Sequence, residues 1–157
     1  AVSVAGEDPD SPGKVNQDAH FHFTLGRFSC IGVLDGHGKK GHVLNEFLAP
    51  HLKQNLEGKL AEVNMEENGQ RPIDGILIDA FEESHYAARM DGNVPAGRSG
   101  TTCVVSLMDE EDGIIYTANV GDSRAILGIQ NDDDADAVAV EVDGCTSNWN
   151  VKQLSVE

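Results

Sequence analysis

The chain has 157 residues, enough for one domain with a hydrophobic core. Its formal net charge of −16, from 27 acidic and 11 basic residues, argues against nucleic acid and anionic membranes as partners, because both require basic patches. No apolar run is long enough to span a membrane and no signal peptide is visible, so we expect a cytoplasmic or nuclear protein. Of the three cysteines, Cys30 and Cys103 lie in apolar runs and are expected in the core.

The N-terminal part predicts two neighbouring strands. Residues Ala1 to Gly13 are rich in proline, glycine and acids and predict a loop. His20 to Phe23 alternates histidine and phenylalanine, which is typical of a half-buried strand. Gly26 marks a hairpin turn, and Phe28 to Leu34 predicts a buried strand.

The buried strand ends at the sequence Asp35-Gly36-His37-Gly38. The glycines allow a sharp turn there. A carboxylate at the end of a buried strand, beside a glycine carbonyl, suits a hard cation such as Mg²⁺, and the adjacent His37 is in position to donate a proton to a leaving group. The alternative is an ordinary tight turn with an exposed histidine, since Asp-Gly is a common hairpin signal.

The middle of the chain predicts two helices. Apolar residues recur at helical spacing from Val43 to Leu56, and Pro50 is expected to kink or divide that helix. The polar stretch from Gly58 to Arg71 predicts a loop. Pro72 opens a second helix whose apolar face runs to Ala88.

The last third predicts strands, in the ranges Thr101–Met108, Ile114–Val120, Ser123–Ile129 and Ala137–Val142. The acidic run from Asn131 to Asp136 is expected to be a solvated loop, because it lacks the glycine and closing glutamate of an EF-hand. Strands followed by helices and then strands indicate an α+β fold with antiparallel sheet and helices on one face.

Four short motifs occur in order: Asn16–Ala19 (NQDA), Asp35–Gly41 (DGHGKKG), Ser99–Thr102 (SGTT) and Asn119–Ala125 (NVGDSRA). Together they resemble the PP2C (PPM) family of metal-dependent Ser/Thr protein phosphatases. The resemblance implies a two-sheet antiparallel β-sandwich flanked by helices, with residues 1–157 as the N-terminal, C-terminally incomplete portion of a single domain.

The resemblance also implies two Mg²⁺ or Mn²⁺ ions, with a weaker third. By position, Asp35 matches the residue that bridges the two metals and Gly36 matches the carbonyl that completes one shell. Gln17 and Asp18 match an acidic pair that holds metal-bound water, and Asp122 matches a ligand of the third ion.

The implied reaction is hydrolysis of phosphoserine or phosphothreonine in a phosphoprotein, by a water held between the two metals. His37 matches the general acid. The chain departs from the family in having Gln17 where glutamate is common, and Lys14 near the position of the phosphate-binding arginine. Lysine pairs with phosphate as a point charge and lacks the bidentate fork of arginine.

Two further hypotheses follow from what the sequence lacks. The family's remaining metal-binding aspartates belong to motifs beyond Glu157, so this portion alone is expected to be inactive and to self-associate through unpaired strands. The alternative function is a catalytically inactive pseudophosphatase that acts as a regulatory binding module.

Overall fold

The computed structural model describes residues 2–6, 13–63, 72–130, 138–142 and 145–155. In chain order its elements are β1 (Ala19–Leu25), β2 (Phe28–Leu34), β3 (Gly36–Gly38), α1 (Gly41–Val63), α2 (Ile73–Met90), β4 (Ser99–Thr101), β5 (Cys103–Asp109), β6 (Ile114–Val120), β7 (Ile126–Gln130), β8 (Val138–Val142) and β9 (Cys145–Gln153).

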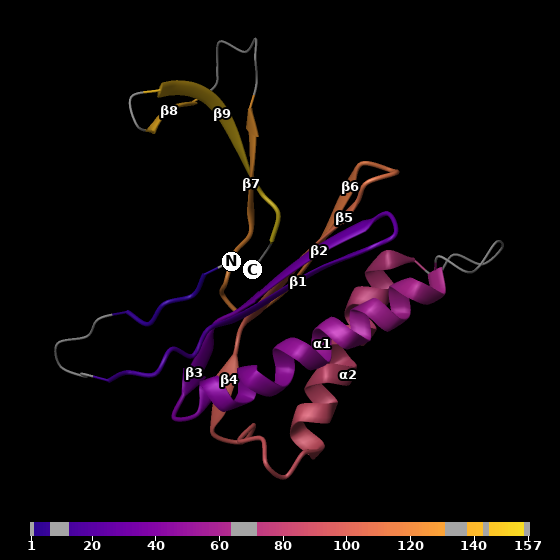
Figure 1. Cartoon of the computed structure of the whole chain (residues 1–157), viewed down its shortest axis with the longest axis vertical. Coiled ribbons are helices and arrows are strands. Elements are labelled where there is room, and N and C mark those ends of the chain that lie inside the picture. Colours follow the sequence, from indigo (N-terminus) through magenta and orange to yellow (C-terminus); the bar gives the residue numbers. More distant parts are fainter. Residues whose placement is uncertain (1, 7–12, 64–71, 131–137, 143–144, 156–157) are drawn as a thin grey trace.

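The strands form three antiparallel sheets. The largest has the order β1-β2-β5-β6, β3 pairs with β4, and a further sheet has the order β7-β9-β8. Figure 1 shows the β7–β9 sheet extending away from the four-stranded sheet. Antiparallel sheets combined with two helices confirm the α+β class that the sequence predicts.

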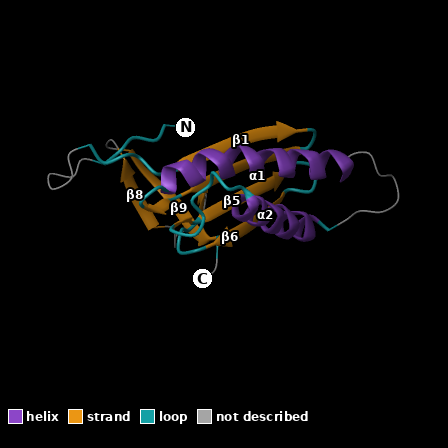
Figure 2. Cartoon of the chain, turned by 90° about the horizontal axis from the view of Figure 1, so that it is seen from below, coloured by secondary structure: helices purple, strands orange, loops and turns teal. Residues whose placement is uncertain are grey.

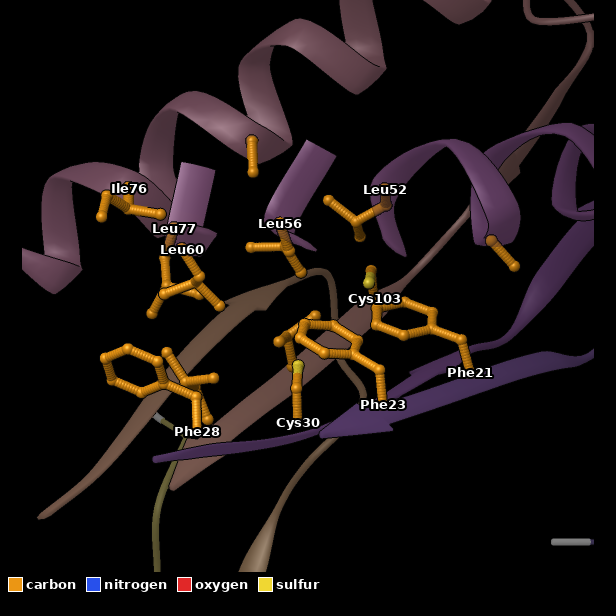
Figure 3. Packing of buried hydrophobic residues seen from close by; sticks show 14 of the residues in the cluster. Phe21, Phe23, Phe28, Cys30, Leu52, Leu56, Leu60, Ile76, Leu77 and Cys103 are labelled. Carbon is orange, nitrogen blue, oxygen red and sulfur yellow. The ribbon is translucent and has the colours of Figure 1, made fainter. Parts of the chain in front are cut away.

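Both helices lie on the same face of the four-stranded sheet (Figure 2). The hydrophobic core lies between these helices and the sheet. Alternate residues of β1 and β2 point into this core. Figure 3 shows Phe21, Phe23 and Cys30 beneath the leucines of α1. Because Gly32 has no side chain, the ring of Phe21 packs directly over its backbone. A Cβ at Gly32 would lie 2.3 Å from Cζ of Phe21.

An ion-pair cluster fixes one end of the four-stranded sheet. Arg27, in the β1–β2 turn, contacts the buried carboxylate of Asp109 at 2.5 Å, and also pairs with Glu111 at 2.9 Å and Asp112 at 2.8 Å. A buried carboxylate requires such a partner. Because these contacts join the β1–β2 turn to the β5–β6 turn, they hold the register that sets the positions of residues at the opposite end.

The helices differ from the sequence prediction in their bounds. Helix α1 continues through Pro50 and reaches Val63, so neither the division at Pro50 nor the loop from Gly58 is correct. Pro50 is exposed, whereas Leu52, Leu56 and Leu60 are buried on the opposite stripe. The free energy gained by burying that stripe offsets the loss of the backbone hydrogen bond that proline cannot make. No helix among the described residues is both long and apolar enough to cross a membrane.

The strands also differ in detail. Gly36–Gly38 forms the short strand β3 instead of a tight turn, and of its two glycines only Gly38 has a left-handed conformation, with a φ of 85°. The third predicted strand of the last third begins at Ile126, later than expected, and β9 was not predicted over most of its length. The acidic run Asn131–Asp136 lies outside the described residues.

Candidate functional site

The antiparallel register brings four motif residues into one row at the end of the four-stranded sheet. Continued past the strand ends, the pairings place Asp18 opposite Asp35, Asp35 opposite Thr102, and Thr102 opposite Gly121. Hydrogen bonds confirm the middle pairing: the Thr102 amide donates to the Asp35 carbonyl at 2.9 Å, and the Asp35 amide donates to Oγ1 of Thr102 at 3.3 Å. Segments 84 residues apart in sequence, from 18 to 102, therefore meet here.

The carboxylates of Asp18 and Asp35 are the charged groups of this row. Ala19 and Leu34 face the core, so by the strand alternation their neighbours Asp18 and Asp35 point to the opposite face. Both aspartates are exposed, and neither is in an ion pair with a described residue. Directly opposed residues have Cβ atoms about 4.5–5.5 Å apart, and like charges there are destabilising. A cation between the two carboxylates removes that repulsion.

A tight cluster beside the row joins the Gln17 segment to β3 and α1. The Gln17 side chain donates from Nε2 to the Gly38 carbonyl at 3.1 Å. Its backbone carbonyl accepts a 2.7 Å hydrogen bond from Nδ2 of Asn45, which is 1% exposed. A Cβ at Gly36 would lie 2.4 Å from the Gln17 carbonyl oxygen, and one at Gly41 would lie 2.2 Å from its Oε1. These contacts with Gly36, Gly38, Gly41 and Asn45 fix the position of Gln17 beside the row.

Asn45 is a residue that the sequence analysis missed. It lies on the buried stripe of α1, four residues after Gly41 and four before Ala49. A polar residue at an apolar position of a helix indicates a specific buried contact. That signal was present in the sequence, whereas its partner Gln17 was not identifiable without the fold.

His37 lies at the middle of β3, opposite Gly100 on β4. Its ring covers the backbone of Gly100, since a Cβ there would lie 2.5 Å from Cε1 of the imidazole. The side chain is exposed, and it also lies on the wall of a cavity of about 1190 Å³ between α1, α2 and β4. Its ring is therefore accessible to a ligand, two residues from Asp35.

The loop that carries Asp122 is connected to the row through Thr102. Oγ1 of Thr102 shares a 2.5 Å hydrogen bond with Oγ of Ser123. Gly121 has a φ of 90°, and a Cβ there would lie 2.8 Å from Cγ2 of Thr102. Asp122 itself is exposed, next to the row. Lys14 is exposed four residues before Asp18, and it is in no ion pair with a described residue.

These residues fit part of a divalent-cation site. Hard cations require six or more oxygen ligands from carboxylates, carbonyls and water, and two opposed carboxylates next to a glycine backbone are donors of that kind. Among the residues that the structure describes, no three His, Cys, Asp or Glu side chains are grouped closely enough to hold a metal. The described residues by themselves therefore do not complete a metal site.

Comparison with known proteins assigns the class. The family model for protein phosphatase 2C matches residues 18–143. Probable protein phosphatase 2C 35 of Arabidopsis thaliana is 31% identical over 134 residues, covering 83% of this chain and 36% of that protein. The integrin-linked kinase-associated serine/threonine phosphatase 2C of Homo sapiens is 33% identical over 111 residues, covering 68% of this chain and 26% of that protein.

The chain belongs to the protein phosphatase 2C family. Its fold is similar to that of the PPM Ser-Thr phosphatase MsPP from Mycobacterium smegmatis, crystallised in complex with cacodylate, with a TM-score of 0.50 and 22% identity over 90% of this chain and 47% of that one. The chain spans between about a quarter and about a third of the length of the curated relatives named above.

Proposed function

We propose that the polypeptide carrying these residues is a metal-dependent protein serine/threonine phosphatase, and that residues 1–157 are the N-terminal portion of its single catalytic domain. The family assignment supports the reaction class. The proposal is carried by the register of β1 and β2 which, continued one residue past Ala19 and Leu34, places the exposed Asp18 opposite the exposed Asp35, beside Gly36 and His37.

In this proposal Asp35 and Asp18 hold Mg²⁺ or Mn²⁺, with the Gly36 carbonyl as a further ligand. When bound, such ions supply Lewis acidity that polarises a phosphate ester and lowers the pKa of water. Asp122 contributes to a weaker ion. Gln17 orients the neighbouring Asp18 through its contacts with Gly38 and Asn45. The remaining ligands come from outside residues 1–157.

The other roles belong to His37 and Lys14. His37 donates a proton to the serine or threonine oxygen as the phosphate ester breaks, and its exposed position over Gly100 supports this role. Lys14 provides a positive charge for the phosphoryl group. Because the family is one of protein phosphatases, the proposed substrate is a phosphoprotein.

The test uses the full-length polypeptide and a phosphothreonine peptide. With Mn²⁺ the parent protein is expected to release phosphate, and Asp35→Asn is expected to lower kcat/KM by at least about 100-fold, roughly 2.7 kcal/mol of barrier. Asp74→Asn, which alters an exposed carboxylate in the first turn of α2, is the control and should change little. Calorimetry with Mn²⁺ supplies a readout independent of turnover, and Asp35→Asn should weaken binding.

Two results would contradict the proposal. Retention of activity within about tenfold by Asp35→Asn, or 1.4 kcal/mol, would remove Asp35 from the metal site. Absence of Mn²⁺-dependent hydrolysis by the full-length parent, despite intact metal binding, would favour an inactive regulatory module instead.

A further inference from the structure

Three cations gather at the end of the β3–β4 pair, next to His37. In the register of this pair, Gly38 lies opposite Ser99. Lys39 and Lys40 directly follow β3, and Arg98 directly precedes β4, so the three residues adjoin this end of the pair. We define Lys39, Lys40 and Arg98 as the basic edge.

The backbone in this region is closely constrained, so the proximity of the three residues follows from the fold. The Lys40 amide donates to Oγ of Ser99 at 3.0 Å. A Cβ at Gly38 would lie 2.8 Å from the Arg98 carbonyl oxygen, so only glycine allows the two segments to approach this closely. In Figure 1, β3 and β4 lie side by side beyond the end of the four-stranded sheet.

The basic edge has no internal counter-charge. Lys39, Lys40 and Arg98 are exposed, and none is in an ion pair among the described residues. Among the other described cations, Arg27 contacts three carboxylates and Lys59 contacts Glu83 at 2.7 Å, whereas Lys14, Arg89 and Lys152 are in no ion pair with a described residue. Like charges that face each other across a strand pair are destabilising. In a chain with net charge −16, three neighbouring unpaired cations therefore indicate a site for an external anion.

We propose that the basic edge binds acidic side chains that flank the phosphorylated residue of the substrate. This inference rests on the proposed phosphatase function. Strand β3 ends at Gly38, so Lys39 directly follows the strand, two residues along the chain from His37. An extended peptide with its phosphoresidue at His37 brings a side chain about two positions away to the basic edge. Aspartate or glutamate at such a position is the matching ligand.

Screening explains how a strongly acidic protein attracts an acidic peptide. At physiological ionic strength the Debye length is about 8 Å, so distant carboxylates are largely screened while the three adjacent cations are not. Each exposed ion pair between the basic edge and a peptide carboxylate contributes only a modest free energy of binding. We therefore expect a preference of about fivefold to tenfold for acidic over neutral flanking residues.

The test compares three phosphothreonine peptides that differ only two positions from the phosphoresidue, where they carry glutamate, glutamine or arginine. Binding to the full-length polypeptide is measured by fluorescence anisotropy at about 150 mM salt with Mn²⁺, using phosphonate analogues of the three peptides, which cannot be hydrolysed. Hydrolysis is measured separately with Mn²⁺. The parent should bind the glutamate peptide about fivefold to tenfold more tightly than the glutamine peptide.

Two variants locate the effect. In K39Q/K40Q/R98Q the preference for glutamate over glutamine should fall to about one, and in K39E/K40E/R98E the arginine peptide should bind best. K53Q/K59Q/K152Q removes the same charge from α1 and β9 and should retain the preference.

Each outcome has one reading. Equal weakening of all three peptides by K39Q/K40Q/R98Q would overturn the inference, because the cations would then bind the phosphoryl group itself. Equal binding of the three peptides by the parent would overturn it as well. If the parent hydrolyses the peptides without preferring the glutamate peptide, the proposed phosphatase function stands and the role of the basic edge is contradicted. If the parent binds the glutamate peptide best but shows no Mn²⁺-dependent hydrolysis, the role of the basic edge is supported and the phosphatase proposal is contradicted.

Discussion

Glycines at the site act through the space that they leave open. Gly41 is the first residue of α1, and the space of its missing side chain is filled by Oε1 of Gln17 and by the backbone of Gly36, whose carbonyl carbon would lie 2.8 Å from a Cβ. A backbone atom cannot move aside as a flexible side chain can. The sequence Gly36 to Gly41 is therefore constrained by packing as well as by turn geometry.

Two alanine substitutions in α1 test this packing. Gly41→Ala should lower the free energy of unfolding by about 1–3 kcal/mol through overpacking. Gly58→Ala, in the same helix with no atom within 4 Å of its added Cβ, should raise it by about 0.5–1 kcal/mol because alanine favours helix. Urea unfolding measures both. A Gly41→Ala protein as stable as the parent would show that the cluster of Gln17, Gly36 and Gly41 relaxes easily.

At the scale of elements, β2 and β5 form the centre of the sheet and bring Cys30 and Cys103 into the core, as the sequence predicts. Burial raises the pKa of each thiol to about 12, with smaller contributions from Glu57 for Cys30 and from Cys30 for Cys103. These pKa values exceed the ordinary value of 9.0. The unfolded chain therefore loses the thiol protons first as pH rises, and this contribution to stability is lost above about pH 9.

The raised pKa values predict unreactive thiols. At pH 8 roughly one thiol in ten thousand is ionised when its pKa is about 12. In a Cys145→Ser variant, Ellman's reagent should modify Cys30 and Cys103 only at the rate of unfolding, and both rapidly in urea. Rapid modification of either thiol in the native protein would mean that β2 or β5 opens locally.

For the whole molecule, the face of the four-stranded sheet opposite the helices is its exposed side. Ile31 and Val33 on β2 are 60% and 55% exposed, and Met108 on β5 lies on the same face. Strands β1 and β6 are the edges of this sheet and carry unpaired backbone groups. Such a surface favours association with another copy of the chain.

We therefore expect the isolated 157-residue chain to self-associate, and increasingly so with added salt. The charge of −16 opposes association, and salt screens it. Light scattering across a salt series measures the effect. Ile31→Thr with Val33→Thr should reduce association, whereas Ile78→Thr, which removes an exposed isoleucine from α2, should not. A monomer at every salt concentration would show that this face is stable in water.

The sequence by itself determined the local features. A continuous apolar run identified the buried strand that ends at Leu34, and helical spacing identified both helices, because these patterns report which sides of an element are buried. The order of the elements identified the α+β class. The motifs identified the family. The expected division of the helix at Pro50 was wrong. The helix-breaking effect of proline is local, whereas the burial of Leu52 to Leu60 that outweighs it depends on the tertiary structure.

Only the tertiary structure decided which residues meet. The register that places Asp18 opposite Asp35, the hydrogen bond of Asn45 to Gln17, and the approach of the Arg98 carbonyl to Gly38 all depend on strand register and helix packing. The residues of each pair are 17 to 60 positions apart. Strand pairing at such separations is set by the burial of the whole sheet against α1 and α2, and no local pattern in the sequence encodes it.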